Sequence, residues 1–255
     1  MFRNAGKVLF IIAAVFWSGL AFAGHPLATD DSGTQGKGNY QFEFTGEYET
    51  TDEAGIVTRE SEVAATLTYG LAESLDLAVG IPYDSFSGLS ETGEKATEQG
   101  GSDMSLAAKW RFFERDGLSV AAKGAITLPT GTEDKGRGTG KVTYSAVCIV
   151  TKDLKPLAVH ANVGYLRNES DFDERRDIWF ASLAAEYSVS DSVKIVANVG
   201  QERNADKTSD VNPFFVLGGV VYAVNDKFDV DLGYKSGLND TEADQAILGG
   251  ITLRF

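Results

Sequence analysis

The chain of 255 residues is short of cysteine, histidine and long apolar runs. Cys148 is the single cysteine, so no disulfide can form within one chain. Only two histidines, His25 and His160, are available for catalysis or metal binding. After residue 23, no apolar stretch reaches the ~18 residues that a membrane helix requires. These absences exclude a disulfide scaffold and a helical membrane protein, and they leave a closed β-barrel as the way to cross a bilayer.

Basic residues are also few, since 23 Lys and Arg face 37 Asp and Glu, for a formal net charge of -14. Nucleic-acid-binding proteins present basic faces to phosphates, so this balance argues against nucleic acid as a partner. Arg3 and Lys7 precede an apolar run at residues 8–16, and a small-x-small cleavage pattern ends at Ala23. Residues 1–23 are therefore predicted to be a cleaved secretory signal peptide.

Apolar and polar residues alternate with a period of two along most of the remaining chain. In FDVDLGYK (228–235), every second residue from Phe228 to Tyr234 is apolar, and the residues between them are charged or glycine. This period predicts strands rather than helices. Twelve such segments occur, at about 39–48, 60–69, 75–83, 102–113, 118–128, 142–151, 157–167, 177–188, 193–202, 213–223, 228–238 and 243–255. Their length of roughly 9–13 residues suits tilted membrane strands better than the ~5–6 residues of soluble ones.

The connections between these segments alternate between short turns and long polar loops. Short acidic turns lie at 71–74, 114–117, 152–155, 189–192 and 224–227, and the longer loops include 84–101, 131–140 and 168–177. Aromatic residues gather in two groups, one beside the short turns and one toward the long loops, as in membrane barrels. A secreted β-sandwich, the alternative, would place its aromatic residues in one core. The pattern predicts an all-β fold, a transmembrane antiparallel up-and-down meander barrel of about 12 strands over residues 39–255.

Both ends of the barrel sequence carry specific expectations. A barrel has no free edge, so the last strand, ending in ILGGITLRF, must pair with the first. Its terminal Phe255 resembles the signal that the bacterial barrel-assembly machinery reads. Residues 24–38 precede the first strand and are rich in glycine and polar residues. We expect them on the periplasmic side, with a position partly inside the barrel mouth as an open alternative.

Charged and polar residues with inward parity are the candidate lumen lining. They are Glu43, Asp76, Lys109, Arg111, Lys123, His160, Asn162, Glu186, Lys194, Asp229, Asp231, Lys235 and Arg254. Barrels of about 8 strands are filled by side chains and those of 16–18 are open, so about twelve strands predict a narrow polar duct. Opposite charges should pair across it, because unpaired buried charges are costly. Phe113 and Phe180 are the aromatic residues with inward parity.

Catalysis and metal binding receive little support from the residues. A lipid hydrolase would require a serine beside a histidine, and Ser145 on a strand neighbouring that of His160 is the available candidate. Asp229 and Asp231 share a face, but no further metal ligand is placed beside them by spacing. We therefore predict no enzyme activity, no cofactor and no metal site. Cys148 has outward parity and is interpreted as a small lipid-facing residue.

The segment HPLATDDSGTQGKGNYQFEFTGEY (25–48), the loop LPTGTEDKGRGTG (128–140) and the terminal RF carry a family resemblance. In these features the chain resembles outer-membrane transporters of the phenol meta-cleavage degradation pathway, over essentially the whole mature sequence. The resemblance implies a barrel that takes up small aromatic or hydrophobic compounds, and it implies no particular ligand-binding residues.

Taken together, the sequence predicts an outer-membrane channel of a Gram-negative bacterium for passive uptake of small molecules. Its short turns would face the periplasm and its acidic loops the exterior. Expected partners are small-molecule solutes, outer-membrane lipids, lipopolysaccharide and, during biogenesis, the barrel-assembly machinery. Two alternatives stay open: a structural or surface-interaction barrel with acidic extracellular loops and a plugged lumen, and an outer-membrane lipid-modifying enzyme.

Overall fold

The computed structural model describes residues 24–53, 55–89, 95–132, 137–169 and 173–255. These residues form thirteen β-strands, and no helix among them is long and apolar enough to cross a membrane. The predicted signal peptide lies outside the described residues. The strands are β1 (Tyr40–Glu53), β2 (Ile56–Ala72), β3 (Leu75–Leu89), β4 (Lys95–Gly101), β5 (Met104–Arg115), β6 (Leu118–Leu128), β7 (Thr143–Asp153), β8 (Leu157–Arg167), β9 (Asp177–Ser188), β10 (Val193–Glu202), β11 (Phe214–Asn225), β12 (Phe228–Gly237) and β13 (Gln245–Arg254).

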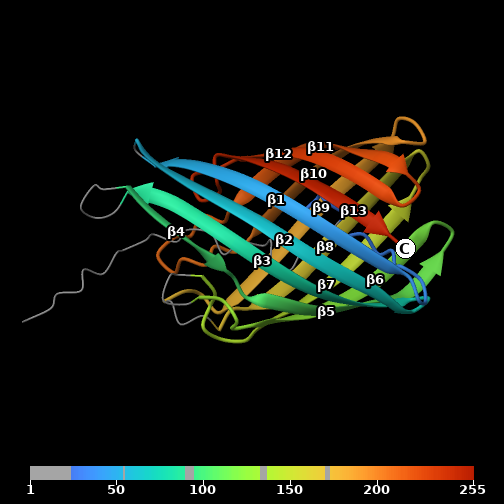
Figure 1. The fold of residues 1–255 in the computed structure, drawn as a ribbon, viewed down its shortest axis with the longest axis horizontal. Coiled ribbons are helices and arrows are strands. Elements are labelled where there is room, and N and C mark those ends of the chain that lie inside the picture. The colour runs from blue at the N-terminus through green and yellow to red at the C-terminus, as the bar shows by residue number, and fades with distance from the viewer. Residues whose placement is uncertain (1–23, 54, 90–94, 133–136, 170–172) are drawn as a thin grey trace, which may run out of the picture.

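Twelve of the strands form a closed antiparallel barrel, and β4 is an additional strand beside β3 (Figure 1). β3 pairs with β4 through its second half and with β5 through its first half. The ring closes where β1 pairs with β13, from Gln41 opposite Arg254 to Thr50 opposite Gln245. The predicted up-and-down barrel is thereby confirmed. We call the end with the short turns, such as 73–74 and 226–227, the turn end, and the opposite end the loop end.

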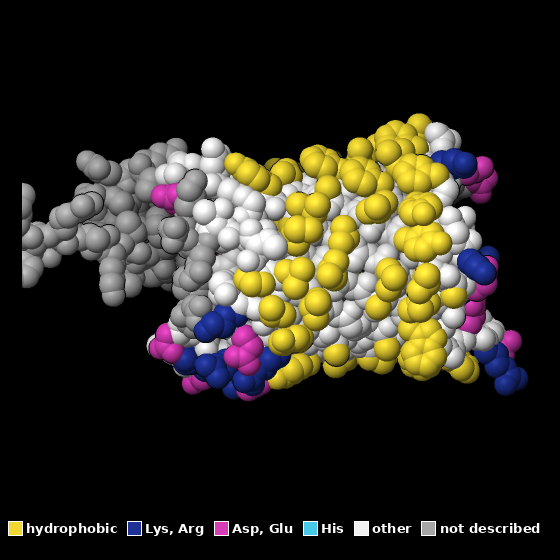
Figure 2. All heavy atoms as spheres, turned by 60° about the horizontal axis from the view of Figure 1, so that its bottom comes forward, with side chains coloured by type: hydrophobic (Ala, Val, Ile, Leu, Met, Phe, Trp, Pro, Cys, Tyr) yellow, Lys and Arg dark blue, Asp and Glu magenta, His cyan; other side chains and the backbone are white. Residues whose placement is uncertain are grey.

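The period of two separates an inner from an outer face of the wall. In β13, Ala246 and Leu248 are 1% and 6% exposed, whereas Ile247 between them is 56% exposed. The outermost side chains of other strands behave alike, with Val163 at 64% and Leu232 at 62%. Figure 2 shows apolar side chains spread over the barrel wall and charged side chains gathered at its ends. Burying such a wall requires hydrocarbon around it, because a soluble protein rarely exposes so large an apolar surface.

Aromatic side chains form two belts on the outer face. Each of the following residues is between 42% and 60% exposed: Tyr40, Phe112, Tyr187, Tyr222 and Phe255 near the turn end, and Tyr48, Tyr83, Tyr144, Tyr165, Trp179 and Tyr234 toward the loop end. Amphipathic rings favour the two membrane–water interfaces, so the belts mark the boundaries of the apolar band.

The predicted loop 84–101 is the main difference between sequence and structure. β3 continues to Leu89, and β4 pairs with it from Tyr83 opposite Gly101 to Leu89 opposite Lys95. β1 and β2 also extend beyond their predicted ends, to Glu53 and from Ile56. Beyond the apolar band, a strand does not contact hydrocarbon and therefore needs no apolar face. The backbone ladder therefore continues where the alternation in the sequence has stopped.

Register shifts interrupt the ladder in β2, β5 and β11, each next to a short turn. In β5, Arg111 pairs with Ala121 and Phe113 with Val120, so Phe112 is an additional residue. A bulge of this kind reverses the inward and outward parity beyond it. The predicted inward position of Phe113 is therefore wrong, since its side chain is 42% exposed on the outer face. Phe180 is 3% exposed and faces inward, over Gly164.

Candidate functional site

Residues 24–38, which we call the N-terminal segment, precede β1, and residues 25–35 of this segment lie in the lumen. At the turn end, the backbone N–H of Gln35 donates to the Asp76 carboxylate, 3.0 Å from Oδ2. Gly70 lies against this entry, where an added Cβ would be 1.8 Å from the carbonyl oxygen of Gly36. Gly36 has a φ of +77°, a conformation that favours glycine. The absence of a side chain at Gly70 thus leaves room for the segment beside the wall.

Asp30 anchors the segment in the middle of the lumen. Its carboxylate lies 2.9 Å from Lys123 Nζ on β6 and 3.2 Å from Lys109 Nζ on β5. The side chains of Asp30 and Lys123 are each 4% exposed. Asn162 on β8 faces the Asp30 backbone. In the amide orientation that satisfies both of its polar atoms, it donates to the Asp30 carbonyl at 2.9 Å and accepts from the Asp30 N–H at 2.7 Å. Without Asp30 the buried ammonium group of Lys123 and the largely buried one of Lys109 would both lose a carboxylate partner, so the segment supplies charge to the wall.

The next carboxylate, Asp31, stays within the segment. It accepts a hydrogen bond from the Gly33 N–H, and Lys109 donates to its backbone carbonyl at 3.2 Å. Burial raises the pKa of the Asp31 carboxyl, but the Lys109 charge and the Gly33 N–H outweigh burial. The pKa of Asp31 therefore lies below its usual value, and the group is ionised at neutral pH.

Hydrogen bonds continue on the loop-end side of Asp30. Asn198 Oδ1 on β10 accepts from the backbone N–H groups of Ala28 and Thr29, at 2.8 Å and 3.0 Å. Asn198 Nδ2 donates to Thr29 Oγ1 at 2.7 Å, and that hydroxyl donates to Ser182 Oγ on β9 at 2.8 Å. Asn198 is 2% exposed and Thr29 1% exposed. Buried polar atoms of the wall are thus satisfied by the segment rather than by water.

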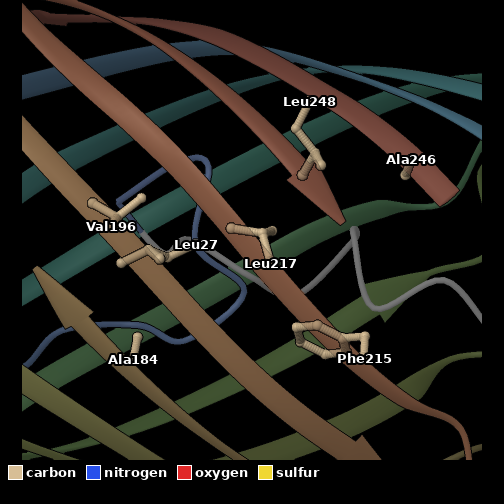
Figure 3. Packing of buried hydrophobic residues seen from close by; sticks show 7 residues of the cluster. All are labelled: Leu27, Ala184, Val196, Phe215, Leu217, Ala246 and Leu248. Carbon is tan, nitrogen blue, oxygen red and sulfur yellow. The ribbon is translucent and has the colours of Figure 1, made fainter. Parts of the chain in front are cut away.

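An apolar cluster fixes the far end of the segment. Leu27 is 4% exposed and packs among inward side chains of β9, β10, β11 and β13 (Figure 3); they are Ala184, Val196, Phe215, Leu217, Ala246 and Leu248. Pro26 lies over Gly219 and Gly233, where an added Cβ would come within 2.8 Å of its ring. His25 Nδ1 is 2.5 Å from Asp231 on β12. The segment therefore contacts the wall along its length.

The segment divides the lumen into two cavities. The turn-end cavity has a volume of about 630 Å³ and the loop-end cavity about 150 Å³. His25 and Glu43 line both, so the boundary between the cavities lies at these side chains. Solute crossing the barrel would have to pass or move the N-terminal segment at this boundary.

Most of the predicted lining residues surround the turn-end cavity. They are Glu43, Asp76, Lys109, Lys123, His160, Glu186, Lys194, Asp229, Asp231 and Arg254. Lys235 lines the loop-end cavity instead. Arg111 and Asn162 line neither, since Arg111 donates to the Glu73 carbonyl at the turn end and Asn162 binds the Asp30 backbone.

Opposite charges along the wall pair with one another. Arg254 Nη1 lies 2.6 Å from Asp229, and Lys194 Nζ lies 2.9 Å from Glu186. In the loop-end cavity, Lys235 Nζ is 2.9 Å from Glu47, 2.5 Å from Glu49 and 3.6 Å from Glu242. Burial raises the pKa of the Glu242 carboxyl more than the Lys235 charge lowers it.

The sequence did not lead us to predict an apolar stripe on the inner wall. Phe215, Leu217 and Leu248 are 9%, 2% and 6% exposed and line the loop-end cavity. β11 is apolar on both faces, which distinguishes it from strands that alternate. A strand with lipid on one side and apolar residues on the other needs an apolar partner inside the barrel. That signal could have indicated the docking of Leu27.

The hydrolase alternative depended on Ser145 and His160. Ser145 pairs with Leu166, whereas His160 pairs with Thr151, six residues further along β7. At about 3.4 Å per residue, roughly 20 Å separates the two positions. His160 Nδ1 instead lies 3.0 Å from Thr151 Oγ1. Among the described residues, no group of three or more His, Cys, Asp or Glu could hold a metal ion.

The long loops fold onto one another around the loop end. Arg175 Nη1 donates to the carbonyls of Asn204 at 3.1 Å and Ser209 at 2.8 Å. Asp103, 7% exposed, accepts from the Thr139 N–H at 2.7 Å and the Thr139 hydroxyl at 2.9 Å. These contacts give the mouth of the barrel a defined frame.

Comparison with known proteins adds a family and a fold. A family model described as "Putative MetA-pathway of phenol degradation" matches residues 25–255. A search of curated proteins gives no match.

Solved structures with a similar fold include channels and a porin. An outer membrane channel from Pseudomonas putida F1 aligns with a TM-score of 0.76 at 14% identity, covering 88% of this chain and 98% of that one. The NanC porin aligns with a TM-score of 0.59 at 8% identity, covering 83% and 98%. The CymD monoaromatic hydrocarbon channel aligns with a TM-score of 0.50 at 11% identity, covering 86% and 88%. At these identities the likeness concerns the fold alone.

Proposed function

This chain belongs to the family described as "Putative MetA-pathway of phenol degradation", and from that membership we propose that it is an outer-membrane channel for passive uptake of small molecules, aromatic compounds included. The observation that carries the proposal is the pair of cavities on either side of the N-terminal segment, both lined in part by charged side chains. A purely structural barrel of this size would gain stability from a filled, apolar interior. Here cavities with charged walls meet at one narrow boundary. The named functions of the channel and porin neighbours agree with this proposal.

In the proposed orientation, the short turns face the periplasm and the long loops face the exterior. The N-terminal segment then reaches into the lumen from the periplasmic side. The wall residues of the turn-end cavity would contact solute after it has passed the boundary at His25 and Glu43. Since the segment is held by hydrogen bonds, ion pairs and one apolar cluster, solute passage would require it to shift or leave.

We also propose partners for the outer face and for assembly. Lipid and lipopolysaccharide would surround the apolar band between the aromatic belts. The barrel-assembly machinery would recognise the terminal strand with Phe255, which is 60% exposed. The backbone N–H of Phe255 donates to Tyr40 O at 3.0 Å, and the Tyr40 N–H donates to Phe255 O at 2.8 Å. Those bonds complete the seam between the first and last strands.

Liposome swelling tests the proposed uptake. The folded protein is reconstituted, and swelling is followed with small sugars, amino acids, phenol and benzyl alcohol. We expect swelling that declines with solute size, and faster swelling in a variant lacking residues 24–33. Heat-dependent migration on a gel confirms that both proteins are folded barrels.

The same assay separates the alternative. If the intact barrel passes no solute but the truncated one does, the intact protein is a plugged structural barrel and the proposed uptake is wrong. If neither passes solute, the cavities do not connect, and transport is wrong for the barrel as a whole.

A further inference from the structure

The loop-end cavity has two walls of unlike chemistry. One wall is apolar and consists of Pro26 and Leu27 from the N-terminal segment with Phe215, Leu217 and Leu248 from the barrel. The other carries six carboxylates: Glu43, Glu47, Glu49, Glu62, Glu202 and Glu242. The uptake proposed above does not by itself require this asymmetry, because a general pore needs only a polar surface.

The carboxylates exceed the positive charge available to them. Among the described residues that line this cavity, Lys235 is the one Lys or Arg, and it already contacts Glu47, Glu49 and Glu242. Glu43 and Glu202 form no ion pair within the part of the chain that the structure describes. Glu43 is nonetheless 5% exposed. A buried carboxylate that forms no direct ion pair and borders a cavity favours a cationic occupant of that cavity.

The positions of Glu43 and Glu202, for which the described residues provide no ion pair, suggest a path. Glu202 ends β10 at the loop end, where solute would enter. Glu43 lines both cavities and so stands at their boundary. A cation drawn in near Glu202 would meet Glu43 next, before the larger turn-end cavity.

Lys235 shows how an ammonium group fits between the two walls. Its Nζ lies 5.9 Å from the centroid of the Phe215 ring while contacting the carboxylates on the other side. A cation near a ring face is attracted by the ring quadrupole. The cavity, at about 150 Å³, has the volume in which an apolar protein cavity holds one benzene molecule. A single ring or short alkyl group therefore fits, and an oligosaccharide does not.

We propose that the loop-end cavity is a binding site for small organic cations, in which the ammonium group lies among the carboxylates and the apolar group lies against Phe215, Leu217 and Leu248. This site adds a class of solute to the proposed uptake, and its physiological role rests on that uptake. Binding itself can occur without transport. The chemical class is a primary or quaternary amine bearing one aromatic ring or a short alkyl chain.

Binding to the full-length folded barrel in detergent, measured by isothermal titration calorimetry, tests the site directly. The probes are benzylammonium, its neutral analogue benzyl alcohol, methylammonium and benzoate. We expect benzylammonium to bind at least about tenfold more tightly than benzyl alcohol and methylammonium, with no binding of benzoate. Benzylammonium carries both features that the cavity recognises, whereas each of the other three probes lacks one of them or reverses the charge.

Three variants assign the effect to the named residues. The double variant Glu43→Gln/Glu202→Gln should lower benzylammonium affinity about tenfold and leave benzyl alcohol within about twofold, since only charge is removed. Phe215→Leu should weaken benzylammonium several-fold and leave methylammonium unchanged. Glu114→Gln removes the same charge beside the turn-end cavity and should change nothing. Heat-dependent gel migration confirms that each variant is folded.

Equal binding of benzylammonium and benzyl alcohol, an unaffected Glu43→Gln/Glu202→Gln variant, or no binding by any probe would each overturn the site. Liposome swelling distinguishes this failure from failure of uptake. Binding without swelling supports the site and contradicts uptake, whereas swelling without preferential binding supports uptake and contradicts the site.

Discussion

Replacing Asp30 with asparagine should release the N-terminal segment from the lumen. The substitution conserves shape but leaves Lys123 and Lys109 without the carboxylate that lies 2.9 Å and 3.2 Å from them. Lys123 has a side chain that is 4% exposed, so water cannot replace the lost partner well. Removing one partner of a buried ion pair costs about 3–5 kcal/mol. At about 1.4 kcal/mol per factor of ten, the equilibrium between docked and released segment should shift by a factor of at least roughly 100.

A cysteine reporter measures this shift. Cys148, exposed on the barrel wall, is first replaced by alanine, and Thr29, which is 1% exposed in the docked segment, is replaced by cysteine. When docking of the segment is faster than labelling, the rate of reaction with a polar thiol reagent is proportional to the fraction of released segment. We expect Asp30→Asn to accelerate labelling by roughly 100-fold or more and to raise single-channel conductance in planar bilayers.

Asp31→Asn is the matched control. It removes the same charge from the next residue, whose carboxylate accepts a hydrogen bond from the Gly33 N–H within the segment. We expect a labelling change of less than about tenfold there. Adding Lys123→Met to Asp30→Asn should recover part of the loss, because the buried ammonium group that faced Asp30 is then removed. If Asp30→Asn labels no faster than Asp31→Asn, the ion pairs do not hold the segment and the reasoning is wrong.

Three further predictions concern the segment and the seam. Gly70→Ala should displace the segment at the turn end and raise conductance, because the new Cβ would lie 1.8 Å from Gly36 O. Gly218→Ala is the control and should leave conductance unchanged, because nothing lies within 4 Å of its new Cβ. Equal effects of the two substitutions would contradict a close fit between Gly70 and the segment. Leu27→Ala should weaken docking by about 2–5 kcal/mol, because it leaves a cavity in the apolar cluster. The measurement is backbone hydrogen exchange, which should become faster at residues 27–30 and stay unchanged in the strands. Unchanged exchange at residues 27–30 would refute a role for the cluster. Phe255→Ala should lower the yield of heat-modifiable barrel in cells several-fold, while the conductance of the purified protein stays the same. A normal yield would show that Phe255 is not an assembly signal.

The strands could be predicted because their signal is local. Alternation in β12 and β13 separates inner from outer residues within a few positions, and lipid outside the wall enforces the pattern at every strand. Parity also placed charged side chains such as Lys123 and Asp229 on the inner wall. It failed at Phe113, since a single additional residue at Phe112 reverses the faces and leaves no mark in composition. It also missed β4, because that strand pairs beyond the apolar band.

The partners of the inner wall could not be read from the chain. Asp30 and Lys123 are 93 residues apart, and Thr29 and Asn198 are 169 apart, so no spacing rule connects them. Composition alone describes residues 24–38 as a polar, glycine-rich leader to the first strand. It does not show that Leu27 completes an apolar cluster with Phe215 and Leu217.

The sequence by itself determined the membrane barrel, because period-two alternation, strand length and aromatic belts are responses to a bilayer that acts on each strand separately. Only the tertiary structure decided what fills the barrel. Closing the wall brings distant strands around one axis, and the charges, amides and apolar residues that meet there acquire partners from a segment that no local pattern could place.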